Sequence, residues 1–433
     1  MPTGRAKTFR ATSQDMMNYI SRGVADQQLH FVIRCAGHLD AARLRKAVEL
    51  CIVAQPVLGC LYFEERKRPC WMTAERGEGW GFSETGPSDL DRDLNDFILI
   101  PADPRKDPMA QVRLFKGPTD TVCIKMNHVC ADAAGTRNYG YLLASIYNSL
   151  GRDPAFVPKE DLRERGMGIV LKRYGLIKRI GFARTAMKFT RGASKQPGRS
   201  WQFPVASASK EGRTMSVRRL ETDRVKRIMD LAKQNGATLN DVLLTAYFRS
   251  LFRIIPVEGE APVPLQVSAD LRRYNPEESS DLIANLSSAI FAAVPPAGTE
   301  TFVQTLTKVK TTMDRMKGRS PLIGAYMIGI PFRLMNYQKA SGVMQQMTAG
   351  RANRGIAMPL LSNFGRLEPD RLEFDGKRPE DAYITTPIMF PPYLMLGATG
   401  YDGSLTFTSG HCRDGVGNDN VEKMLDLVVS ELP

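Results

Sequence analysis

The sequence predicts an α/β protein made of two similar halves, and three observations support this. Short segments in which apolar and polar residues alternate, typical of strands, are interleaved with longer segments that have an apolar face at helical spacing. The same plan starts again in the second half, without a short-period repeat. A chain of 433 residues, 43% hydrophobic and 24% charged, is also long enough for two to three domains' worth of core.

A Gly, Ser and Pro-rich stretch, RGASKQPGRSWQFPVAS, is the best candidate for the junction between the halves. We therefore expect an N-terminal lobe over residues 1–195, a linker over 196–213 and a C-terminal lobe over 214–433.

In the first half, Thr12–Asp15 predicts the start of a helix and Gln28–Gly37 predicts a strand. Leu39–Val53 predicts an amphipathic helix, because its apolar residues share one face and Asp40 lies in its first turn. Residues 109–115 and 121–128 are expected to form a hairpin that turns at Gly117-Pro118.

In the second half, the alternation over residues 215–220 and 264–268 predicts two strands. Helices are expected over residues 222–234, 238–254 and 301–316, where apolar residues recur at helical spacing.

The stretch Thr121–Gly135, TVCIKMNHVCADAAG, is where we expect the functional site. Its first part predicts a half-buried strand, with Val122, Ile124, Met126 and His128 on one face and Cys123, Lys125 and Asn127 on the other. The pattern breaks at Val129, and Asp132 is placed to cap a helix that Gly151 ends. Of the four histidines, His128 alone has an acidic residue four positions later.

A histidine at the end of an apolar strand suits a general base, since imidazole titrates near neutral pH and takes protons from hydroxyl, amine or thiol groups. The alternative is structural: Asp132 is only a helix cap, and His128 is a satisfied core residue. The spacing of the two residues does not decide between these interpretations.

Composition and motifs exclude several classes of protein. Seven scattered cysteines make no CxxC pair and no disulfide framework, which favours a reducing compartment. No apolar segment follows MPTGRAKTFR, and the uncharged run over 382–401 contains three prolines, so we expect a cytoplasmic protein without a secretory signal or membrane span. There is no GxSxG, Walker A, HExxH or helix-opening GxGxxG motif, and we expect no metal and no bound cofactor.

A basic segment supplies most of the net charge of +13: residues 165–210 hold eleven Lys or Arg residues and no Asp or Glu. No zinc-finger, RNP-like or helix-turn-helix pattern accompanies it, so nucleic acid is not an expected partner. Apolar residues within the segment favour an anionic membrane surface or an anionic partner, and the alternative is a solvated helix face. The candidates for donor or surface binding are Lys172, Arg173, Lys178 and Arg179.

Several stretches, in order along nearly the whole chain, resemble the chloramphenicol acetyltransferase-like (HxxxD) superfamily of acyltransferases. This superfamily includes peptide-synthetase condensation domains, wax ester synthases and plant-type alcohol acyltransferases. NHVCADAAG is similar to its HHxxxDG motif, and GHLDAARLRKAVELCIVAQPVLGCLY resembles its first long helix and the next strand. The first helix of the second lobe resembles GATLNDVLLTAYFRSL. An arginine-bearing strand of the family and the strand after it resemble VSADLRR and NLSSAI, and a late strand-turn motif resembles LSNFGRLEP.

The resemblance implies two lobes, each a mixed β-sheet with flanking helices, and a tunnel between them. His128 would deprotonate a hydroxyl or amine acceptor, which attacks a thioester of coenzyme A or of acyl carrier protein phosphopantetheine. Asp132 would face away from the substrate and pair with an arginine, for which Arg272 is the candidate. Two residues depart from the motif: Asn127 replaces its first histidine, and Ala133 replaces the glycine after the aspartate.

Other residues have two interpretations each. Asn363 either donates to an oxyanion or builds the turn before Gly365, and Cys130 is expected to be a bystander. The methionines of residues 313–347 either line an acyl channel or fill the core. Two functions stay open: an acyltransferase with a small-molecule or lipid acceptor, or a non-catalytic docking protein of the same fold. Expected partners of either are an acidic carrier protein or an anionic membrane surface, the latter with peripheral attachment.

Overall fold

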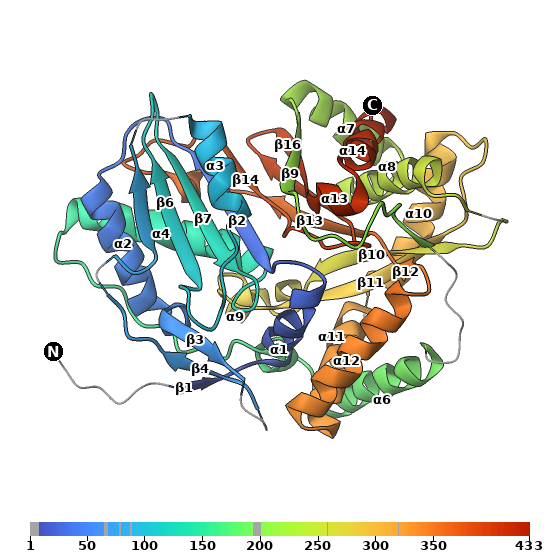
Figure 1. Cartoon of the computed structure of the whole chain (residues 1–433), viewed down its shortest axis with the longest axis horizontal. Helices are drawn as coiled ribbons and strands as arrows, with labels where there is room; N and C mark the ends of the chain where they lie inside the picture. Colours follow the sequence, from blue (N-terminus) through green and yellow to red (C-terminus); the bar gives the residue numbers. More distant parts are fainter. Residues whose placement is uncertain are drawn as a thin grey trace.

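Two lobes lie side by side, each centred on a mixed β-sheet that helices cover (Figure 1). The structure is a computed structural model that describes residues 8–64, 68–77, 79–86, 89–193, 201–257, 259–318 and 320–433, with the backbone alone for 189–193. The expected α/β class with two lobes is therefore confirmed.

The sheet of the N-terminal lobe has five strands, in the order β14-β2-β7-β6-β5. They are β14 (Asp381–Ile384), β2 (Gln28–Arg34), β7 (Thr121–Asn127), β6 (Ala110–Phe115) and β5 (Phe82–Thr85). All neighbours are antiparallel except the parallel pair β5 and β6. The predicted hairpin is confirmed, because β6 pairs with β7 from Ala110 opposite Met126 to Phe115 opposite Thr121.

Strand β7 is buried on both faces, so the prediction of a half-buried strand was wrong. Its apolar face packs against helices α2 (Ala41–Ala54) and α4 (Ala133–Arg152). Helix α3 (Leu90–Leu99) covers the other face, where Cys123 lies in an apolar cluster and the Lys125 ammonium donates to the Ile100 carbonyl at 2.6 Å. The polar residues that suggested a solvent-facing side are thus satisfied within the protein.

The sheet of the C-terminal lobe has six strands, in the order β11-β10-β13-β15-β16-β9. They are β11 (Ser287–Val294), β10 (Val263–Asp270), β13 (Leu360–Arg366), β15 (Met395–Tyr401), β16 (Ser404–Cys412) and β9 (Arg213–Leu220). Its core is formed with α7 (Thr222–Gln234), α8 (Leu239–Ile254), α10 (Phe302–Met316) and α14 (Asn418–Glu431). The strands and helices expected here all form, with β10 longer than predicted because it pairs with β11 along its whole length.

The N-terminal sheet takes one strand from the C-terminal half of the chain, which the proposed lobe boundaries do not include. β14 comes from the C-terminal half but pairs antiparallel with β2 at the edge of the N-terminal sheet. Part of the expected linker, residues 196–200, lies outside the described residues. After it, β8 (Trp201–Gln202) pairs with β12 (Ile356–Ala357), and Trp201 and Phe203 are buried in the C-terminal core, so this part of the linker is packed.

A third layer lies on the lower side of Figure 1, below both sheets. Its small sheet holds β1 (Thr8–Arg10), β4 (Cys70–Thr73) and β3 (Cys60–Phe63). Its helices are α1 (Ser13–Ile20), α5 (Met167–Leu171), α6 (Leu176–Ala193), α11 (Ser320–Leu334) and α12 (Tyr337–Ala352). The short helices α9 (Pro276–Ser279) and α13 (Arg413–Val416) complete the fold.

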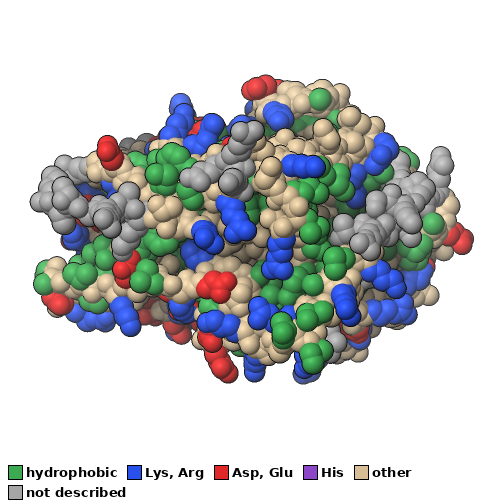
Figure 2. Space-filling view, turned by 90° about the horizontal axis from the view of Figure 1, so that it is seen from below, with side chains coloured by type: hydrophobic (Ala, Val, Ile, Leu, Met, Phe, Trp, Pro, Cys, Tyr) green, Lys and Arg blue, Asp and Glu red, His purple; other side chains and the backbone are tan. Residues whose placement is uncertain are grey.

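Lys and Arg side chains are spread across this underside between apolar patches, as Figure 2 shows from below. Within the described parts of the chain, no helix combines the length and the apolar character that crossing a bilayer requires.

Candidate active site

His128 is the first residue after β7, at the centre of the N-terminal sheet. Its backbone N–H donates to the Gln27 carbonyl at 2.8 Å, and the turn closes when the Cys130 N–H donates to the Asn127 carbonyl at 2.9 Å. The ring is half-buried, and burial lowers the pKa of His128 below 6.5 although the Asp132 carboxylate acts in the opposite direction. The imidazole is therefore neutral at neutral pH.

Asp132 caps helix α4 and also holds an ion pair. One carboxylate oxygen accepts from the Gly135 N–H at 2.8 Å, and the other accepts from the Leu286 N–H at 2.7 Å. Arg272 lies across both oxygens, with N–O distances of 3.0 and 3.1 Å. Although burial opposes ionisation, these donors hold the pKa of Asp132 below its usual 3.8. The carboxylate has no position left for a substrate.

Arg272 ties this turn to the C-terminal lobe. Its guanidinium, 3% exposed, donates to the Leu282 carbonyl at 3.0 Å and to the Ala284 carbonyl at 2.8 Å, besides pairing with Asp132. The residue that the sequence nominated as the partner of Asp132 is thus the one that contacts it. The pair connects α4 with the segment that leads into β11.

Asn18 of α1 contacts the His128 ring. Its amide nitrogen lies 3.1 Å from His128 Nδ1, 2.9 Å from the His128 carbonyl oxygen and 3.0 Å from Asn285 Oδ1. The side-chain amide has two hydrogens, so the two oxygens can take both.

A buried carboxylate fixes which way these amides point. Asn285 donates to Asp15 Oδ1 at 2.9 Å and to the Val129 carbonyl at 2.8 Å, and both of these partners are acceptors. The Asn285 nitrogen must therefore face them, and its oxygen must face Asn18. Asp15, Asn285 and Asn18 thus form a chain of hydrogen bonds of fixed polarity that ends at His128.

Asp15 is fully buried and is held from three sides. It forms a capping box with Thr12 at the start of α1, as the prediction of a helix start there implies. The Trp71 indole donates to it at 3.1 Å, and an Arg165 nitrogen lies 3.5 Å away. Arg165 also donates to the Cys130 carbonyl at 2.6 Å, which links the chain of hydrogen bonds to the turn after His128.

Asn363 and Gly365 lie in β13, in the C-terminal sheet. The Asn363 side-chain oxygen accepts from the Gly365 N–H at 3.0 Å, where the pairing with β15 has an irregularity. Gly365 has φ +84°, a left-handed conformation that favours glycine. Of the two interpretations of Asn363, this contact matches the turn-building one.

Of the four basic candidates, Lys172 and Arg173 lie between α5 and α6, and Lys178 and Arg179 lie on α6. Lys172, Arg173 and Lys178 are exposed and Arg179 is half-buried, and Lys172 pairs with Glu278 at 2.9 Å. No contact joins them to the His128 turn in the described part of the chain.

Cys130 agrees with its expected role as a bystander, whereas the methionines as a group match neither of their two interpretations. Burial raises the pKa of the Cys130 thiol to about 12, so it is not a nucleophile at neutral pH. Met313 is buried in the C-terminal core, whereas Met347 is 58% exposed on α12. The methionines do not form one continuous lining.

Comparison with solved structures matches this architecture over essentially the whole chain. No family model and no curated protein sequence matches the chain. The trichothecene 15-O-acetyltransferase TRI3 of Fusarium sporotrichioides superposes with a TM-score of 0.73 at 14% identity, over 100% of this chain and 96% of that one. The chain has the chloramphenicol acetyltransferase-like fold.

Other structures of this chloramphenicol acetyltransferase-like fold match equally fully. The first condensation domain of the CDA synthetase gives a TM-score of 0.71 at 15% identity, covering 98% of this chain and 95% of that one. The epimerization domain from the third module of tyrocidine synthetase B gives 0.69 at 14% identity, covering 99% and 96%.

The sequence nominated His128, Asp132 and Arg272, but it missed Asn18, Asn285 and Asp15 of the same site. NLSSAI, which resembles a strand of the chloramphenicol acetyltransferase-like fold, contains Asn285 without indicating its contact. Asp15 was visible only as the acidic residue of a helix start. Nothing in the spacing of the three residues marks them as neighbours.

Proposed function

We propose that the protein is an acyltransferase in which His128 is the general base. It moves an acyl group from a thioester of coenzyme A, or of a carrier protein, to a hydroxyl or amine acceptor. The observation that carries this proposal is a neutral, half-buried imidazole at the end of the central strand. Asn18 of α1 contacts its ring, and the Gln27 carbonyl accepts from the backbone N–H of the same histidine.

The surroundings of the ring support Nε2 as the proton acceptor. The His128 carbonyl and the Asn285 side chain both favour a proton on the ring. The Asn18 amide next to Nδ1 can donate its two hydrogens to the His128 carbonyl oxygen and to Asn285 Oδ1, so it does not need Nδ1 as an acceptor. The proposed mechanism uses the tautomer that has the ring proton on Nδ1 and the lone pair on Nε2. Nε2 has no hydrogen-bond partner among the residues that the structure describes, so it is free to accept a proton from a substrate.

The reaction needs no covalent intermediate on the enzyme. Nε2 takes the proton of the acceptor as its oxygen or nitrogen attacks the thioester carbonyl carbon. The tetrahedral intermediate collapses, the carbon–sulfur bond breaks, and the imidazolium returns the proton to the leaving thiolate. The products are an ester or amide and a free thiol. Asp132 and Arg272 take no proton in this scheme, and they hold the turn that positions the ring.

His128→Ala tests this proposal. With acyl-coenzyme A donors and a panel of alcohols and amines, we expect the variant to lose a factor of about 10²–10⁴ in turnover, measured by thiol release and by mass spectrometry of the product. His38→Ala is the matched control, because His38 is a histidine of the same lobe whose side chain is 67% exposed. More than half of wild-type turnover in His128→Ala would exclude His128 as the base.

A further inference from the structure

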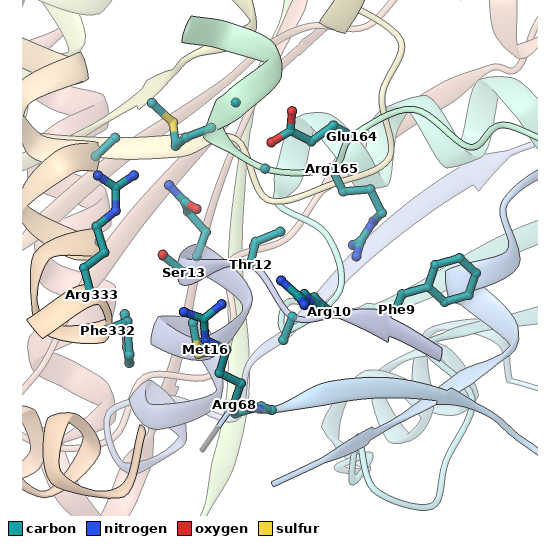
Figure 3. A pocket seen from close by; sticks show the side chains of 18 of the residues that line it. Phe9, Arg10, Thr12, Ser13, Met16, Arg68, Glu164, Arg165, Phe332 and Arg333 are labelled. Carbon is teal, nitrogen blue, oxygen red and sulfur yellow. The ribbon is translucent and has the colours of Figure 1, made fainter. Parts of the chain in front are cut away.

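A cavity of about 720 Å³ lies between the small sheet, the first turn of α1, residues 163–168 and helix α11. Figure 3 shows that side chains from these four places converge on it, with Arg10 from β1, Arg68 from the segment before β4 and Arg333 from α11. None of these three arginines belongs to the basic segment that the sequence singled out.

Arg10, Arg68 and Arg333 have no acidic partner among the residues that the structure describes. In the described part of the chain none of them has an ion pair, and all three are exposed to solvent. Glu164 is the acidic side chain among the described lining residues (Figure 3). Three guanidinium groups facing one carboxylate favour a ligand with at least two negative charges, because a single negative charge would leave the excess unmatched.

Two further arginines line the cavity but are already neutralised. Arg163 pairs with Asp161 at 2.7 Å and Asp281 at 2.9 Å, and Arg165 lies 3.5 Å from Asp15. They shape the wall, whereas the other three arginines are available to an anion.

Gln14 supplies a second and independent indication of a ligand. Its side chain lines the cavity and is 4% exposed, yet neither its amide oxygen nor its amide nitrogen has a hydrogen-bond partner among the described residues. Buried amides in folded proteins are nearly always paired, so this one lacks a partner that a bound molecule can supply. Gln14 also lies in the first turn of α1, where the helix dipole favours negative charge.

The cavity adjoins the turn that carries His128. Arg165 lines it and donates to the Cys130 carbonyl at 2.6 Å. Gln14 lies four residues before Asn18 in α1, so the two side chains follow one another along one face of the helix. A ligand bound by Gln14 is therefore one helical turn from the residue that contacts the His128 ring.

We propose that this cavity, which we call the arginine pocket, binds a phosphate ester with at least two negative charges, as the anionic end of the thioester donor. The assignment rests on the proposed acyl transfer and deepens it. Phenylalanine and methionine side chains beside the arginines, from Phe9, Met16 and Phe332, provide apolar surface for the uncharged part of the same molecule. Two molecules carry such an ester: coenzyme A, whose nucleotide end has a 3′-phosphate and a diphosphate, and free 4′-phosphopantetheine, whose phosphate is a monoester. On a carrier protein the same phosphate is a diester with one negative charge, so it does not meet this requirement.

Calorimetric titration of the full chain tests the proposal with four probes: coenzyme A, dephospho-coenzyme A, 4′-phosphopantetheine and inorganic pyrophosphate. We expect the triple variant Arg10→Gln, Arg68→Gln, Arg333→Gln to bind coenzyme A about 100-fold more weakly than the unaltered protein. The control triple Lys226→Gln, Arg227→Gln, Lys233→Gln removes the same charge from the exposed side of α7 and should change the affinity less than about twofold.

Gln14→Leu separates a binding role from a structural one. It removes an amide that has no partner among the described residues, so the melting temperature should stay the same or rise. The affinity for the probe should nevertheless fall about tenfold. A merely structural glutamine would not weaken binding while leaving the fold stable.

The outcomes are distinct. If dephospho-coenzyme A binds more weakly than coenzyme A and pyrophosphate competes with coenzyme A, the pocket holds the nucleotide end. If 4′-phosphopantetheine binds as tightly as coenzyme A, the pocket holds the pantetheine end. The proposal is overturned if no probe binds, if the arginine triple variant binds coenzyme A as tightly as the unaltered protein, or if the control triple variant loses as much affinity as the arginine triple. His128→Ala should keep probe binding, so the proposed catalysis and the arginine pocket can fail separately.

Discussion

Replacing Asp132 by alanine should act on stability first and on turnover through it. The side chains of Asp132 and Arg272 are 5% and 3% exposed, and removing one partner of a buried pair costs about 3–5 kcal/mol of unfolding free energy. Loss of the bond from the Gly135 N–H adds about 1 kcal/mol for the helix cap. Arg272 keeps Asp270 at 3.1 Å and two carbonyls, so we expect the lower part of this range.

Urea denaturation of Asp132→Ala, Arg272→Met and the double variant measures the effect. The double variant should be less destabilised than the sum of the single ones, because each single variant leaves a buried polar group without its partner. Asp281→Ala is the control. Asp281 is 57% exposed and pairs with Arg163, and this pair should contribute no more than about 1 kcal/mol.

The pH dependence of this difference has a fixed sign. The pKa of Asp132 is held below 3.8 in the folded protein, so its stabilisation is complete above pH 3.8 and is lost as the pH falls through the lowered value. The gap between wild type and Asp132→Ala should therefore close only in acid. A variant that loses its activity while its unfolding free energy changes by less than about 1 kcal/mol would refute the structural role.

Two further predictions concern turnover and binding. Because burial lowers the pKa of His128 below 6.5, wild-type kcat/KM should rise with pH through one ionisation below pH 6.5 and stay constant above it. A rise centred above pH 7 would contradict the assignment of His128 as the general base. Changing Lys172, Arg173, Lys178 and Arg179 to glutamine should raise the apparent KM of the donor or weaken binding to anionic liposomes. The value of kcat should change by less than about twofold, and added salt should have the same effect as the substitutions. If neither salt nor the substitutions alters affinity, the basic segment is only a solvated surface.

The sequence predicts best what depends on neighbouring residues. The helix that Asp132 caps and the hairpin that ends at Asn127 both follow from local periodicity and capping, and both form. The prediction that β7 is half-buried was wrong because its burial depends on α3, which is not its neighbour in the sequence. Lys125 looks like a solvent-facing residue, but α3 lies over it and the Ile100 carbonyl and the Phe97 ring receive its ammonium.

The contacts of the site could not be predicted because they join distant parts of the chain. Asn18 lies 110 residues from His128, and Asn285 lies 270 residues from Asp15. The arginine pocket is assembled in the same way, from arginines in three segments that lie far apart in the sequence. Arg272 was nominated only because a resemblance to known acyltransferases supplied the missing spatial information.

The pairing of β14 with β2 has a consequence for synthesis on the ribosome. β2 is made early, but β14, its partner at the sheet edge, follows about 350 residues later. At usual elongation rates, β2 waits roughly 20–70 s for this partner. During that time an edge rich in Phe31, Val32 and Ile33 is unprotected and open to pairing with other nascent chains. The N-terminal lobe expressed alone would lack β14 and keep this edge unpaired, so the two halves of the chain should be expressed together.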